Sequence, residues 1–154
     1  MPDLVTHVSA GIIISRLLRK KLIMPLFLLG SILPDVSFKI LELFFPSFHF
    51  GFMAFHSLPS QTAISLVLSQ YFEKGEKRSA FLNLFAGATT HLLFDFAQLH
   101  ITGENYYWFL PFSSWHGELG LFSTTSWIYY MPVMFTAALA AESIFRLSGR
   151  WRRR

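Results

Sequence analysis

The stretch Gly87-Ala-Thr-Thr-His91-Leu-Leu-Phe-Asp95 places an imidazole and a carboxylate inside a long apolar segment. His91 and Asp95 are four residues apart, so a helix puts them on one face, about one turn from each other. An ionisable side chain in such apolar surroundings is energetically expensive and usually has a function. The two side chains are therefore candidates for half of a metal site. The alternative is a simple hydrogen bond between them within packed helices.

The composition of the rest of the chain is typical of a small membrane protein. Of its 154 residues, 53% are hydrophobic and 14% are charged, whereas roughly a quarter of the residues in soluble proteins are charged. The sequence therefore predicts an all-α integral membrane bundle of four or five helices, with residues 1–154 forming a single domain. The chain has no cysteine, so any metal is expected to be held by histidine, carboxylate and water.

Five apolar segments account for the predicted helices. Because about 20 residues are needed to cross the hydrocarbon core, the first segment is short for a full crossing, and whether it spans or packs against the bundle stays open. The fourth and fifth segments are long enough to span, and the third is moderately short. The segments cover approximately residues 4–18, 22–45, 58–72, 79–99 and 127–147.

The second segment contains Leu33-Pro34-Asp35. Proline removes a backbone donor and is expected to kink or end the helix, with Asp35 at the break. Backbone groups freed at membrane depth are tolerated only where they face protein or a wet cavity. The simpler alternative is a plain helix end at which Asp35 caps the following turn.

The basic residues are gathered in three clusters. Of the 13 lysines and arginines, only Lys39 lies outside residues 16–21, 74–78 and 146–154. Such clusters mark the cytoplasmic ends of membrane helices. If the four later segments cross alternately, all three clusters share the cytoplasmic side, which also holds the C-terminus. The net charge of +4 is then explained by the inner (plasma) membrane topology, and no nucleic-acid partner is expected.

The same topology places all six histidines, including His116, on the non-cytoplasmic side with Asp35 and Asp95. Histidines scattered for structural reasons would fall on both sides, so this segregation predicts one site. Histidine and carboxylate ligands suit zinc, with manganese or iron as alternatives, and the sequence leaves one or two metals open. A metal held there would activate water and polarise a phosphoryl or carbonyl oxygen. Asp35 and Glu118 are both candidates for a general base.

The loop before the last segment is aromatic, with Tyr106, Tyr107, Trp108 and Trp115. These side chains are expected to form an interfacial belt. The alternative is that they wall a pocket in which a lipid-like substrate meets water.

A set of motifs occurs in a fixed order that covers nearly the whole chain through Ser113. The motifs are His7 near the N-terminus, Leu-Gly-Ser-Ile-Leu-Pro34-Asp35, His56-Ser57-Leu58, Thr90-His91-Leu-Leu-Phe-Asp95 and Leu110-Pro111-Phe112-Ser113. This set resembles the membrane-bound metal-dependent hydrolases, the family that includes a LexA-regulated inner-membrane protein of enterobacteria. The chain also looks distantly similar to the helical zinc-dependent phospholipases C and single-strand nucleases.

The resemblance implies a hydrolase that acts on a phosphoester or another lipid-linked bond of a membrane substrate. It implies that the metal ligands are His7, Asp35, His56, His91 and Asp95.

The chain departs from the family before the third segment. The family often has His-Arg-Gly-x-Thr-His-Ser there, whereas this chain has His49-Phe-Gly-Phe-Met-Ala-Phe-His56-Ser57. The arginine is missing and the upstream histidine is displaced, so His49 is not carried over as a ligand. Lys39 could replace the arginine, although a pair between Lys39 and Glu42 is the simpler explanation.

Two other functions remain open at this point. A non-enzymatic metal-binding or transport protein would also place polar residues near the membrane midplane on a broken helix. A structural protein could use its histidines for hydrogen bonds between helices.

If Asp35 and His91 bind the same metal, the distance between them can be predicted. Two ligands with metal bonds of about 2 Å each lie roughly 3–4 Å apart. We therefore expect the Asp35 carboxylate at that distance from the His91 imidazole.

Overall fold

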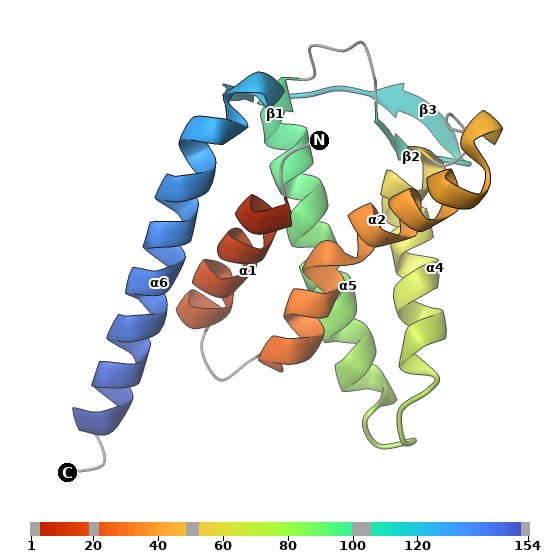
Figure 1. Ribbon diagram of the computed structural model, residues 1–154. Coiled ribbons are helices and arrows are strands. Elements are labelled where there is room, and N and C mark those ends of the chain that lie inside the picture. The colour runs from red at the N-terminus through yellow and green to blue at the C-terminus, as the bar shows by residue number, and fades with distance from the viewer. Residues whose placement is uncertain (1–3, 19–21, 49–52, 100–105, 152–154) are drawn as a thin grey trace.

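The computed structural model describes residues 4–18, 22–48, 53–99 and 106–151 (Figure 1). The predicted all-α class is confirmed, because five α-helices form the frame of this described part. They are α1 (Leu4–Leu18), α2 (Met24–Phe44), α4 (Leu58–Ser69), α5 (Lys77–Ala97) and α6 (Trp127–Trp151).

Three of these helices are long and apolar enough to cross a membrane, namely α2, α5 and the part of α6 from Ile128 to Ser148. Helix α1 is apolar but shorter. Helix α4 has 12 residues, which at 1.5 Å per residue gives about 18 Å, too short to cross the hydrocarbon core. The third segment, predicted to be moderately short, is therefore shorter than a full crossing requires.

The helices alternate in direction along the chain (Figure 1). In that view α1, α4 and α6 run downward, whereas α2 and α5 run upward. The end of α1, the turn between α4 and α5 and the end of α6 consequently lie at the same, lower end of the bundle. The basic clusters that the structure describes begin there, as the charge pattern predicts. The side of the membrane that this end faces stays a prediction.

The most extensive helix contact joins α2 and α5, and glycines make it possible. A Cβ on Gly30 of α2 would overlap the carbonyl oxygen of Leu84, and a Cβ on Gly87 of α5 would overlap that of Phe27. The two backbones can approach this closely only because both residues lack a side chain, as is common between membrane helices. His91 follows Gly87 by one turn, so this contact fixes where α5 meets the outer half of α2.

Helix α2 continues through Pro34, which lies inside it. The orange helix changes direction along its length in Figure 1, as a proline within a helix predicts. The alternative of a helix end capped by Asp35 is wrong, because Asp35 lies within the helix and is buried. The hydroxyl of Ser37 donates a hydrogen bond to the carbonyl of Pro34 (2.9 Å) and thereby supports the turn after the bend.

The connections between the helices are partly ordered into short elements. Residues between α2 and α4 form the 3₁₀ turns η2 (Pro46–Phe48) and η3 (Met53–His56), and η4 (Thr124–Ser126) precedes α6. In the described part of the chain, four short strands follow α5: one at the end of the predicted fourth segment, and three in the aromatic region that was predicted as a loop. These are β1 (Gln98–Leu99), β2 (Tyr107–Phe109), β3 (Ser113–His116) and β4 (Phe122–Ser123). Strand β1 pairs with β4 in parallel, and β2 pairs with β3 in antiparallel orientation.

The aromatic region packs inward as well as outward. Tyr106 and Trp108 are buried in a core cluster with Phe38, Met53 and Leu92. The indole of Trp108 donates a hydrogen bond to the carbonyl of Gly117 (2.8 Å). Trp115, by contrast, is half exposed. The expected interfacial belt is therefore wrong for Tyr106 and Trp108, whose side chains instead cover the helices beneath them.

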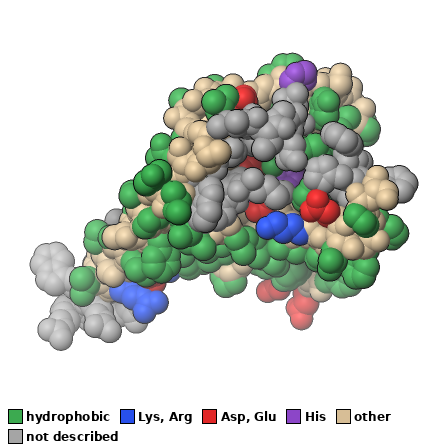
Figure 2. Space-filling model, turned by 45° about the horizontal axis from the view of Figure 1, so that its top comes forward, with side chains coloured by type: hydrophobic (Ala, Val, Ile, Leu, Met, Phe, Trp, Pro, Cys, Tyr) green, Lys and Arg blue, Asp and Glu red, His purple; other side chains and the backbone are tan. Residues whose placement is uncertain are grey.

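The outer surface is that of a protein surrounded by lipid. Green hydrophobic side chains cover most of the flank seen in Figure 2, and charged side chains on that face are few. Large hydrophobic residues along α6, such as Val133, Leu139 and Ile144, are more than half exposed. Such a row is unfavourable in water and favourable against acyl chains.

Candidate metal centre

Four separate elements bring the five predicted ligands to one place. His7 comes from α1, Asp35 from α2, His56 from η3, and His91 with Asp95 from α5. Every one of these side chains is at most 3% exposed. Within the described residues, His7, Asp35 and His91 form one group whose ligand atoms lie within 4.8 Å of one another, and His56, His91 and Asp95 form a second.

His91 is at the centre of the cluster. Its Nε2 lies 3.2 Å from Oδ2 of Asp95, one helical turn away, and 3.8 Å from Oδ1 of Asp35 on α2. The predicted distance of 3–4 Å between Asp35 and His91 is therefore confirmed. These two residues are brought together by the close contact of α2 with α5, across 56 positions of sequence.

Each carboxylate lies between two imidazoles. Asp95 lies between His91 and His7, whose Nε2 is 3.5 Å from Oδ1 of Asp95. The His7 ring stacks on the His91 ring with centroids 3.8 Å apart and planes inclined by 18°. Asp35 lies between His91 and His56, whose Nε2 is 3.4 Å from Oδ1 of Asp35. The five side chains thus form one continuous cluster.

A backbone contact sets the orientation of His91. Its Nδ1 lies 2.8 Å from the carbonyl oxygen of Ser31, and because a carbonyl can only accept, Nδ1 carries the proton. A neutral His91 then presents the lone pair of Nε2 toward the carboxylates of Asp35 and Asp95. A histidine that binds a metal is commonly held in this way, by a carbonyl on its other nitrogen.

Several buried polar atoms of the cluster have no hydrogen-bond partner, and their chemistry shows whether the cluster suits a cation. Among the described residues, both ring nitrogens of His7, Nε2 of His91 and both carboxylate oxygens of Asp95 are buried without a hydrogen bond. They approach one another to 3.2–3.5 Å without hydrogen-bond geometry. Each buried polar atom left unpaired costs roughly 1–3 kcal/mol. Each of the two groups combines histidine nitrogens with one carboxylate, which is a donor set that fits a divalent cation.

Aromatic side chains hold His56 on its outer side. The Tyr106 ring stacks on His56 with centroids 5.0 Å apart, and Phe38 meets it edge-on at 5.4 Å. The next residue, Ser57, caps the start of α4 and its hydroxyl lies 3.0 Å from the carbonyl of Leu110. The motifs that begin at His56 and at Leu110 are therefore in direct contact.

Several predicted residues lie elsewhere. His116 is exposed on β3, where its ring packs against Tyr107 with centroids 5.8 Å apart. Glu118 is also exposed, so the carboxylates inside the cluster are those of Asp35 and Asp95. His49 and His100 lie outside the described residues.

Sequence reasoning did not identify Ser31 as a contributor to the site. Ser31 acts through its backbone carbonyl, which lies 2.8 Å from Nδ1 of His91. A backbone carbonyl leaves no signature in the sequence of side chains, so no sequence signal pointed to this residue.

An apolar cavity lies among α4, α5 and the aromatic region. It has a volume of about 290 Å3 and is lined by Leu58, Thr89, Leu92, Phe96, Trp108 and Trp115, among others. Two of these residues are near predicted ligands in the chain, because Leu92 follows His91 directly and Leu58 is two residues from His56. Trp108 and Trp115 of the aromatic region form part of its wall.

One protein family matches the chain over almost its entire length. The family model described as YdjM inner membrane protein matches residues 1–153. No curated protein and no solved structure matches the chain. The family description agrees with the three apolar helices in placing the chain in a membrane.

Proposed function

From the premise that the chain belongs to the YdjM inner membrane protein family, we propose that it is a membrane-bound, metal-dependent hydrolase. Its metal, with zinc as the first candidate, is held by a set of five side chains. Its substrate is a phosphoester or another lipid-linked bond, reached from the non-cytoplasmic side. The ligands are His7, Asp35, His56, His91 and Asp95.

The observation that carries this proposal is the convergence of five buried ionisable side chains from four elements. A structural hydrogen-bond network would pair its polar atoms, because unpaired atoms cost stability at no gain. Here Nε2 of His91, both oxygens of Asp95 and both ring nitrogens of His7 are unpaired. Among these five described side chains, the one hydrogen bond joins Nε2 of His56 to Oδ1 of Asp35 (3.4 Å). This pattern favours a ligand set over a network of hydrogen bonds.

When bound, a divalent cation supplies a Lewis acid that polarises the scissile group and activates water. The protein's own residues fix the geometry. Ser31 holds the His91 ring through Nδ1, and the stacked Tyr106 ring holds that of His56. Asp35 is the better candidate for a general base than Glu118, because it lies inside the cluster and Glu118 is exposed.

The apolar cavity supports a lipid-linked substrate. Its wall contains leucine and aromatic side chains, which favour a hydrocarbon chain over a soluble sugar or nucleotide. Its lining includes Leu92, which follows His91 in the chain, and Leu58, which is two residues from His56. On this proposal, a chain bound there brings its polar end toward the histidines. His91 and Asp95 also lie near the end of α5, whereas the basic residues Lys77 and Arg78 lie at its start, which is consistent with a site on the non-cytoplasmic side.

The proposal is tested with the purified full-length protein. We expect stoichiometric zinc, and cleavage of a generic phosphodiester that stops with a chelator and returns with zinc. His91→Ala should lose both properties, because it removes the central ligand. His116→Ala is the matched control, since this exposed histidine lies outside the cluster, and it should retain both.

The outcomes separate the hypotheses. Bound metal in the wild type without turnover of phosphodiesters or lipid substrates would favour the non-enzymatic metal-binding or transport protein. Equal metal content in the wild type and in His91→Ala would contradict the ligand set itself.

A further inference from the structure

A second feature of the molecule lies at the basic end, where α1 meets α6. We call it the α1–α6 seam, and define it by Val8, Ile12 and Arg16 of α1 with Leu139, Glu142 and Arg146 of α6. The two helices pack against each other, but the seam is not filled. It contains a hollow of about 560 Å3 whose wall is mostly apolar and which has Arg16, Glu142 and Arg146 at one end.

The charged end of the seam is built around one carboxylate. Nε of Arg16 lies 2.6 Å from one oxygen of Glu142, and Nε of Arg146 lies 2.7 Å from the other. Two guanidinium groups and one carboxylate leave one net positive charge. Arg16 also lies over the Phe145 ring, with its Cζ 4.4 Å from the centroid. Both guanidinium groups are therefore held in place at the end of the hollow.

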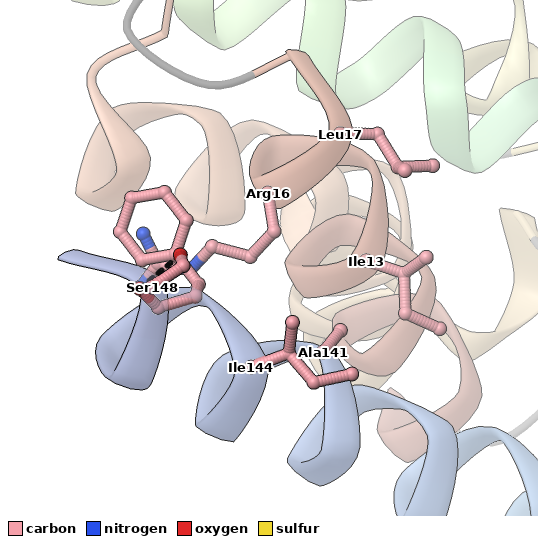
Figure 3. Close-up of a pocket in the computed structure, with 7 residues that line it drawn as sticks. Ile13, Arg16, Leu17, Ala141, Ile144 and Ser148 are labelled. Carbon is pink, nitrogen blue, oxygen red and sulfur yellow. Dashed lines mark hydrogen bonds between the residues drawn. The ribbon is translucent and has the colours of Figure 1, made fainter. Parts of the chain in front are cut away.

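Arg16 also borders a second, smaller hollow of about 330 Å3 on the seam. Figure 3 shows the Arg16 side chain extending from α1 toward α6, between the two helices. Around it lie Ile13 and Leu17 of α1 with Ala141, Ile144 and Ser148 of α6. The fixed charge thus stands between two largely apolar hollows.

The guanidinium groups of Arg16 and Arg146 lie near the end of the membrane-crossing part of α6, at the depth of the membrane interface. The membrane-crossing part of α6 ends at Ser148, two residues beyond Arg146, so the guanidinium groups lie where a bilayer places its headgroups. The apolar hollow extends from them along α1 and α6 toward Leu4 and Phe135, which is the direction of the acyl chains.

We propose that the α1–α6 seam binds an anionic phospholipid, with one acyl chain in the larger hollow and the phosphate beside Arg16 and Arg146. The argument is charge complementarity. One net positive charge meets one phosphodiester charge, and guanidinium forks recognise phosphate oxygens well. A zwitterionic lipid carries its own cation and would bring that cation toward the arginines, so the seam distinguishes the two lipid classes.

The test is native mass spectrometry of the full-length protein released from bilayers that contain equal amounts of phosphatidylglycerol and phosphatidylethanolamine with identical acyl chains. We expect phosphatidylglycerol to remain bound preferentially. Arg146→Gln should lower that preference about fivefold, the effect of one basic residue near an anionic lipid. This variant leaves the Arg16–Glu142 contact between α1 and α6 in place. Lys77→Gln is the matched control, because Lys77 bonds to Gln70 at the same end of the bundle but away from the seam.

A second pair of variants tests the hollow. Val8→Phe fills part of it and should reduce retention of both lipids, whereas Val133→Phe, on the exposed face of α6, should not. Equal retention of the two lipid classes by the wild type would overturn the proposal. So would an unchanged preference in Arg146→Gln, or a dimer that Val8→Phe dissociates in the absence of any lipid preference.

Discussion

Replacing Asp95 by asparagine tests the metal centre through stability. Asp95 is 1% exposed and lies 3.2 Å from His91 and 3.5 Å from His7. Asparagine has nearly the same shape but no charge, so the packing of α5 is retained while a ligand is lost. The expected effect is a loss of the stabilisation that zinc provides, with little change in the fold.

The magnitude follows from linkage. A cation bound only by the folded protein, at a concentration 1,000 times its Kd, stabilises by about 4 kcal/mol. For a chain of this size 1 kcal/mol raises Tm by roughly 2–4 °C, so zinc should raise the wild-type Tm by about 10 °C. A hundredfold weaker site leaves about 1.4 kcal/mol at the same zinc concentration, or about 4 °C.

The assay is thermal unfolding of the purified protein with a chelator and with excess zinc, comparing the wild type, Asp95→Asn and His116→Ala. The reasoning predicts a large zinc shift for the wild type and His116→Ala and a small one for Asp95→Asn. An equal zinc shift in all three proteins would refute it. The reasoning would also be refuted if zinc shifted the Tm of none of the proteins while Asp95→Asn lowered the Tm itself, because Asp95 would then be a hydrogen-bond partner only.

Three further predictions follow from the structure. Gly87→Val should destabilise the protein by about 1–3 kcal/mol, because the new side chain would overlap the α2 backbone. Gly75→Val is the control, since no atom lies within 4 Å of a Cβ at that position. Equal unfolding midpoints for the two variants would contradict the close contact. Tyr106→Ala should reduce zinc affinity by about tenfold, because the loss of a group that orients a metal ligand weakens binding. Zinc titration measures this affinity. An unchanged affinity would mean that the stacked Tyr106 ring does not position His56. A reporter that is active only outside the cytoplasm should give no signal when fused after Arg154, because the basic clusters predict a cytoplasmic C-terminus, and a strong signal would reverse the topology.

The helices could largely be predicted from the sequence, because hydrophobic runs are a local property. The first segment matches α1 at both ends, and the fourth differs from α5 by two residues at each end. Helix α4 ends three residues earlier than expected, before the polar turn. Helix α2 was harder to predict, since whether a proline ends or bends a helix depends on the packing around it. Here α2 continues through Pro34, and its first half packs closely against α5 at Gly30.

The convergence of the five residues could be predicted, but the details of their surroundings could not. The spacing of His91 and Asp95 is local, the charge pattern placed Asp35 and all six histidines on one side, and the family resemblance selected the five residues from that larger set. The role of Ser31 could not be predicted, because a backbone carbonyl leaves no signature in the side-chain sequence. The burial of Tyr106 and Trp108 depends on how β2 packs over α2 and α5, and the same aromatic composition would also suit an interfacial belt.

The central claim, that histidines and carboxylates of the cluster bind one divalent metal, is tested most directly by X-ray absorption spectroscopy at the zinc edge of the zinc-loaded protein. The account predicts nitrogen and oxygen neighbours at about 2.0–2.1 Å, with outer-shell scattering from at least two imidazoles that decreases in His91→Ala. Zinc surrounded by water oxygens alone, or an imidazole signal that His91→Ala leaves unchanged, would contradict it.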